Sequence, residues 1–136
     1  MKTILIYYSF SGKTKKLAEK TADKENIDII EIKEVKKRGK LSAFFSGCPK
    51  AVGQKASKIQ PPEIDLNQYE KIILMAPVWA GNPAPAFNAV IEMLLENKDI
   101  DVILTAGSGE CGCKEKLSAL IESKKCSLSG FETVKA

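Results

Sequence analysis

Short apolar runs alternate with amphipathic stretches along most of this 136-residue chain. Five runs rich in β-branched and aromatic residues predict strands buried on both faces, because such strands read as continuous apolar segments. These strands are predicted at residues 2–8, 28–32, 71–76, 101–106 and 130–135. Apolar positions at three- and four-residue spacing predict helices at residues 14–22, 84–95 and 114–124. Strands that alternate with helices predict right-handed crossovers and a parallel sheet, which is the α/β class.

Proline and glycine residues mark the predicted ends of these elements. Pro77 is predicted to stop the third strand, and a glycine-rich turn at residues 107–109 is predicted to end the fourth. Residues 39–59 mix apolar residues with proline and glycine, and we interpret them as an irregular, partly helical connection. The length fits a single domain, residues 1–136. Apolar runs of at most five residues exclude a transmembrane helix and a signal-peptide core, so a cytoplasmic location is expected.

Composition removes several classes of chemistry. The chain has no histidine, which excludes Ser-His-Asp triads, histidine bases and the commonest zinc ligand sets. Its four cysteines contain no CxxC pair, and without an export signal they are expected as reduced thiols. The net charge of +4 is unevenly placed, because residues 33–58 carry eight basic residues and one acid. This basic segment is either a solvated loop or a surface for an acidic or phosphorylated partner.

The first motif joins the first strand to the first helix. It consists of Ser9, Phe10, Ser11, Gly12, Lys13 and Thr14. Three hydroxyls flank a glycine where the free N–H groups and dipole of a helix N-terminus favour an anion, which predicts a cup for a phosphate group. An ordinary helix cap is the alternative, since a cap needs one hydroxyl. A Walker A loop is excluded because Tyr7 stands where GxxxxGK[ST] requires glycine.

Two further loops follow the third and fourth strands. The second contains Pro77, Val78, Trp79, Ala80, Gly81 and Asn82, and the third contains Thr105, Ala106, Gly107, Ser108, Gly109, Cys111 and Gly112. The single tryptophan lies on a proline-stiffened loop and suits stacking on a flat heterocycle, although a tryptophan that caps the core is the alternative. Glycines in the third loop let backbone amides face a ligand. All three loops follow strands, so they are expected together at the carboxyl edge of the sheet.

These loops resemble the flavin loops of the flavodoxin family. Residues 7–14 (YYSFSGKT) are similar to its phosphate loop, residues 76–87 (APVWAGNPAPAF) to its second loop, and residues 105–109 (TAGSG) to its third. Residues 61–70 also resemble the family's approach to the third strand. The resemblance implies a flavodoxin-like, doubly wound, five-stranded parallel sheet in the order 2-1-3-4-5; flavodoxin is a standard example of ligand binding at the switch point of such sheets.

The resemblance also implies flavin mononucleotide (FMN) as the cofactor. It assigns the phosphate to the first loop and the isoalloxazine to the second and third loops. FMN rather than FAD is further expected because a hydroxyl-lined cup occurs without the GxGxxG pyrophosphate loop. Cys111 and Cys113 are expected as reduced thiols near the flavin edge. No catalytic side chain and no metal site is assigned.

The implied function is that of an FMN-binding redox flavoprotein, either an electron carrier or a small oxidoreductase that is NAD(P)H-linked or quinone-reductase-like. A binding or signalling module that no longer uses flavin is the alternative. The acids of a receiver domain and the Cys…Arg loop of a small phosphatase are absent after the first strand. The expected partner is a redox protein, NAD(P)H or a small-molecule acceptor, with no nucleic acid and no membrane.

Three features depart from the family pattern. Lys13 replaces a small polar residue, the third loop lacks an aromatic residue, and the family's last helix is missing after the fifth strand. Without that helix, the sheet near the first and fifth strands is expected to show a bare apolar patch. A two-fold homodimer would cover this patch, and a truncated chain is the competing explanation.

Overall fold

The computed structural model describes residues 2–10, 12–33, 65–79, 82–106 and 113–135. Its elements are, in chain order, β1 (Thr3–Tyr7), α1 (Lys13–Glu25), β2 (Asp28–Glu31), the 3₁₀ helix η2 (Leu66–Gln68), β3 (Lys71–Trp79), β4 (Asn82–Pro83), α4 (Pro85–Glu92), β5 (Asp99–Ala106), α5 (Lys114–Ser123) and β6 (Ser127–Lys135). Five strands pair in parallel in the order β2-β1-β3-β5-β6, and β4 pairs antiparallel with the end of β3. This confirms the predicted α/β class and the order 2-1-3-4-5 of the long strands.

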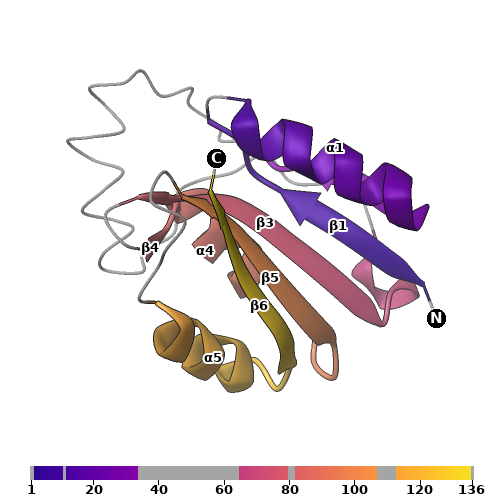
Figure 1. Cartoon of the computed structure of the whole chain (residues 1–136). Helices are drawn as coiled ribbons and strands as arrows, with labels where there is room; N and C mark the ends of the chain where they lie inside the picture. The colour runs from indigo at the N-terminus through magenta and orange to yellow at the C-terminus, as the bar shows by residue number, and fades with distance from the viewer. Residues whose placement is uncertain (1, 11, 34–64, 80–81, 107–112, 136) are drawn as a thin grey trace.

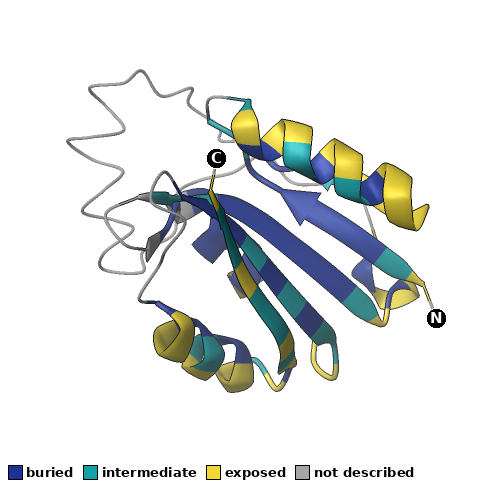
Figure 2. Ribbon diagram, in the orientation of Figure 1, coloured by how far each residue is buried: buried dark blue, intermediate teal, exposed yellow. Residues whose placement is uncertain are grey.

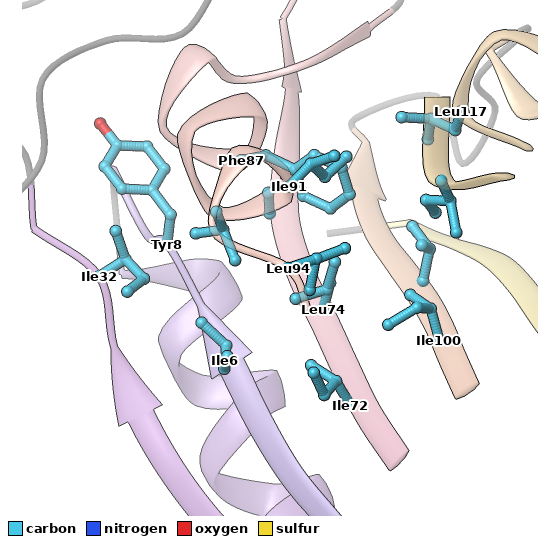
Figure 3. Packing of buried hydrophobic residues seen from close by; sticks show 14 of the residues in the cluster. Ile6, Tyr8, Ile32, Ile72, Leu74, Phe87, Ile91, Leu94, Ile100 and Leu117 are labelled. Atoms are coloured by element: carbon cyan, nitrogen blue, oxygen red, sulfur yellow. The ribbon is translucent and has the colours of Figure 1, made fainter. Parts of the chain in front are cut away.

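The helices cover the two faces of the sheet unequally. Helix α1 lies on one face, and α4 and α5 lie on the other (Figure 1). The larger core lies under α4 and α5, where Phe87, Ile91 and Leu117 pack on alternate residues of the strands such as Leu74 and Ile100 (Figure 3). The smaller core lies under α1. Strands β1 and β3 are buried along almost their whole length, as continuous apolar runs predict (Figure 2).

Element boundaries differ from the sequence prediction where a local contact decides them. Strand β3 does not stop at Pro77 but continues to Trp79. Pairing with β1 ends at Met75, so the missing N–H of the proline falls beyond the part of β3 that is flanked on both sides. Helix α1 extends to Glu25, because Asn26 supplies a left-handed C-cap (φ 53°) whose N–H donates to the Ala22 carbonyl.

Strand β6 also starts earlier than predicted. A register shift against β5 lies between Ile100 and Asp101, and it leaves Ser129 without a register partner. The extra residue lets Gly130 come level with Asp101, where an added Cβ would lie 2.9 Å from a carboxylate oxygen. A bulge of this kind is invisible to a pattern search, because it interrupts the two-residue period that marks a strand.

The part of the sheet that α1 leaves uncovered carries charged side chains among half-buried apolar ones. Residues of β5 that do not face α4 and α5 point to the side of α1, and they include Asp99 and Asp101. Asp101 forms an ion pair with Lys71 of β3 at 3.1 Å, and Glu132 of β6 is exposed in register with Ile103. The expected apolar patch is therefore wrong for the described residues, whose exposed large hydrophobic side chains are Ile29 and Leu95. The homodimer stays a prediction, without the support of that patch.

No helix among the described residues is both long and apolar enough to cross a membrane.

Candidate functional site

The three predicted loops begin at neighbouring positions on one edge of the sheet. Strands β1, β3 and β5 are adjacent and parallel, with Tyr7 in register with Met75 and Pro77 in register with Thr105. The chain leaves all three strands at their carboxyl ends, which lie at the same edge in Figure 1. This edge is where the order of a doubly wound sheet opens a crevice for a ligand. The topology therefore brings the starts of the predicted loops together, as the sequence implied.

Gly12 shapes the first loop. Its φ of 95° is a left-handed conformation that glycine adopts without strain, and it is the N-cap residue of α1. Its backbone N–H donates to the Ser9 hydroxyl at 3.0 Å, so Ser9 fixes the turn from inside. Accepting this bond leaves the Ser9 O–H able to donate elsewhere. Ser11 lies outside the described residues, and Phe10 is half-buried against the larger core.

The first turn of α1 has an unusual charge distribution. It contains Lys13, Lys15 and Lys16, all exposed, and no acidic residue. Lysines at a helix N-terminus oppose the positive end of the helix dipole and cost a few tenths of a kcal/mol each. A local rule broken in this way is typical of a functional site, where a ligand compensates the cost. The ligand that would compensate here is an anion.

A buried hydroxyl pair connects this helix to the third loop. Thr14 is the second residue of α1, Thr105 is the last but one residue of β5, and their hydroxyl oxygens are 2.8 Å apart. Their side chains are only 2% and 5% exposed. The sequence assigned Thr14 to a phosphate and Thr105 to a flavin ring, and reasoning from sequence missed that they touch. The available signal was the inward position of Thr14, which shares a helical face with Ala18 and Ala22.

The structure describes the beginning and the end of the second loop. Pro77 and Val78 are half-buried at the end of β3, and Val78 packs against the larger core. The backbone of Trp79 pairs with Asn82, and the Ala84 N–H donates to the Pro77 carbonyl at 3.0 Å, so β4 lies antiparallel along the end of β3. Ala80 and Gly81, and the side chains of Trp79 and Asn82, lie outside the described residues. The two interpretations of the tryptophan therefore remain predictions.

The third loop is described only at its beginning. Thr105 and Ala106 are buried, and Gly107, Ser108, Gly109, Cys111 and Gly112 lie outside the described residues. Cys113, just before α5, is buried and disulfide-bonded. The expectation of a reduced thiol is wrong at this residue, and the partner cysteine lies outside the described residues. The expectation holds for Cys126, which is a free, buried thiol donating to the Leu95 carbonyl at 3.0 Å.

Two hollows on the described surface lie at the other end of the sheet. They surround the α4–β5 and α5–β6 connections and are lined in part by Lys124 and Lys125. These ammonium groups already have partners, the Glu92 carbonyl at 3.2 Å and the Glu96 carboxylate at 3.5 Å. Both hollows are open to solvent and lie away from the carboxyl edge of the sheet, and we do not assign the site to them.

Comparison with solved structures identifies the fold. A flavoprotein from Lactobacillus acidophilus NCFM, crystallised in complex with FMN, superposes with a TM-score of 0.82 at 24% identity over 97% of this chain and 92% of its own. A candidate flavoprotein from Bacteroides eggerthii gives 0.85 at 16% identity, over 99% and 89% of the two chains. Oxidised flavodoxin 1 from Bacillus cereus gives 0.59 at 17% identity, over 100% and 86%. No protein-family model and no curated protein sequence matches the chain. The chain thus has the flavodoxin-like α/β fold.

Proposed function

We propose that the chain binds FMN at the carboxyl edge of its sheet and acts as a redox flavoprotein. The observation that carries the proposal is the first turn of α1, where a left-handed glycine precedes three exposed lysines and no acid. Such a turn suits a phosphate dianion, because free backbone N–H groups, the helix dipole and the ammonium groups act in the same direction. The FMN bound by the Lactobacillus acidophilus flavoprotein, on the same fold, supports this choice of anion.

The described residues fit the phosphate end of FMN. The space where a Cβ would lie at Gly12 is open, with no atom within 4 Å. An anion can therefore approach the backbone of this glycine closely. Ser9 and Thr14 each keep hydrogen-bonding capacity beyond the bond that the structure gives them, since a hydroxyl has one proton and two lone pairs. The buried position of Thr14 removes water as a competitor for that capacity.

The described residues also fit the edge of a flat ring. Pro77 and Val78 present half-buried apolar surface at the end of β3, beside the buried start of the third loop. FMN supplies the redox chemistry when bound, and the protein supplies orientation and a polar or apolar surrounding. We propose a redox protein, the electron donor NAD(P)H or a small-molecule electron acceptor as the partner, and the cytoplasm as the location.

The pigment of the purified protein tests the proposal. We expect a yellow protein with flavin absorbance, and a released chromophore with the mass of FMN. A colourless protein that stays colourless after incubation with FMN would contradict the proposal and favour a binding module on the same fold. FAD as the released species would overturn the choice of cofactor. Oxidation of NADPH or NADH in repeated turnover would favour an oxidoreductase over a carrier.

A charge reversal at the start of α1 gives a sharper test. Lys13→Glu should stabilise the apoprotein by about 0.3–1 kcal/mol, because it places an acid at the positive end of the helix. The same change should weaken FMN binding, because it puts a negative charge beside the phosphate. Lys20→Glu, at an exposed position in the middle of the same helix, is the matched control and should leave FMN affinity nearly unchanged. Equal effects of the two variants on FMN binding would remove the first turn of α1 from the site.

A further inference from the structure

The Thr14–Thr105 pair is buried more deeply than a solvent-facing helix cap. Both side chains are at least nine-tenths buried, and 91 residues of sequence separate them. Burying a hydroxyl costs free energy unless its hydrogen bonds are kept, so a buried pair at the rim of a ligand site requires a structural or functional reason. Thr105 is held in the sheet between Pro77 of β3 and Val134 of β6. Thr105 is therefore the more rigidly held member of the pair, and Thr14 is the member that belongs to the first turn of α1.

In a hydrogen bond between two hydroxyls, one group donates its proton and the other accepts it. Either oxygen in this pair can be the donor. If Thr105 donates, Thr14 keeps its own proton for a further acceptor at the N-terminus of α1. If Thr14 donates, its proton is directed towards the sheet and away from the helix end. An anion at the helix end favours the first arrangement, because a hydrogen bond to a charged acceptor is stronger than one between neutral groups.

We infer that Thr105 is a positioning residue for the phosphate of FMN: it donates its hydroxyl proton to the Thr14 oxygen and so directs the Thr14 proton at the phosphate. This inference rests on the proposed function and adds a residue that the predictions from sequence had assigned to the flavin ring. Thr105 itself does not touch the phosphate. It fixes the rotamer of Thr14 and polarises its O–H, which strengthens a chain of hydrogen bonds that ends on a charge. It also links the first and third loops before the ligand arrives, which lowers the cost of ordering them.

Riboflavin provides the readout, because it has the same ring as FMN but no phosphate. Thr105→Val keeps the branched shape and removes the hydroxyl. We expect it to raise the Kd for FMN roughly three- to tenfold, which corresponds to the loss of about one hydrogen bond, and to change the Kd for riboflavin less than about twofold. Thr105→Ser keeps the hydroxyl and should stay close to the wild type in both. Thr21→Val removes a hydroxyl that donates to the Leu17 carbonyl on the same helix, and it should leave the FMN-to-riboflavin ratio unchanged.

A double-mutant cycle tests the chain of contacts. In a Thr14→Val background, Thr105→Val should no longer change the FMN-to-riboflavin ratio, because the residue through which it acts is absent. If Thr105→Val does not fold, which urea unfolding of the apoprotein would reveal, Thr105→Ala replaces it in the same cycle. An unchanged ratio in a folded Thr105 variant would overturn the inference, and so would a loss of riboflavin affinity as large as that of FMN. These results leave the proposed function standing as long as the wild type binds FMN. A wild type that binds no FMN overturns both.

Discussion

Replacing Gly12 by alanine isolates the strain in the first loop. Gly12 has φ 95° and ψ −9°, and an added methyl group would meet no atom within 4 Å. Steric overlap therefore adds nothing, and the whole cost comes from the backbone. For an L-residue in the left-handed region this cost is about 1–2 kcal/mol. Alanine also lowers the conformational entropy of the unfolded chain, which stabilises the folded state by about 0.4–1 kcal/mol. The expected net loss in the free energy of unfolding is about 1 kcal/mol.

Urea unfolding of the apoprotein, followed by circular dichroism, measures this loss. The midpoint should fall while the slope with urea stays constant, because one added methyl group hardly changes the surface that unfolding exposes. Gly12→Asn is the matched control, since asparagine tolerates positive φ and should recover part of the loss. An alanine variant as stable as the wild type would refute the strained turn. A loss above about 3 kcal/mol would refute the open space around Gly12, because backbone strain alone does not reach that size.

Two further predictions concern groups away from the site. The Tyr69 phenol donates to the Asp28 carboxylate at 2.7 Å, and this bond, with burial and the Asp28 charge, raises the pKa of Tyr69 above 10.0. The fold therefore favours the protonated phenol, whose contribution to stability is present below pH 10 and lost as the pH rises further. The Tm of the wild type should fall above pH 10, and Tyr69→Phe should make this fall less steep. Curves of Tm against pH that run parallel for the two proteins would contradict this. The Lys71–Asp101 pair raises the pKa of Lys71 through its hydrogen bond and the carboxylate charge, yet on this face of the sheet, which α1 covers only in part, the two side chains remain 33% and 25% exposed. A double-mutant cycle of Lys71→Met and Asp101→Asn should give a coupling below about 1 kcal/mol, whereas several kcal/mol would show that this face is shielded from water.

The sequence pattern predicted the elements better than their contacts. Strands such as β1 and β3 are buried on both faces, and that environment leaves a continuous apolar run that can be recognised without knowing the neighbouring strands. The end of β3 was predicted wrongly because a proline is costly only where its missing N–H would pair with a neighbouring strand. Strand β1 no longer pairs with β3 at Pro77, and the sequence of β3 alone does not show this. The start of β6 was missed because a bulge breaks the period of two.

Contacts between distant segments explain the remaining differences. The part of the sheet without a covering helix was predicted to be apolar, because the sequence shows too few helices to cover both faces. It carries the Lys71–Asp101 ion pair instead, whose members come from two different strands, each of which reads as mostly apolar. The link between Thr14 and Thr105 likewise depends on how α1 crosses the sheet. In both cases each residue reads as ordinary in its own segment. Only the packing of the two segments shows that a charge or a hydroxyl has a partner.

A flavin titration of the apoprotein tests the central claim most directly. FMN and riboflavin are added in parallel, and flavin fluorescence reports binding. We expect one FMN per chain and a Kd for FMN at least about tenfold below that for riboflavin, because each charge-assisted bond to the phosphate contributes roughly 1.5–3 kcal/mol. Binding of riboflavin as tightly as FMN would contradict the phosphate site at the start of α1. Binding of neither flavin would contradict the proposed function itself.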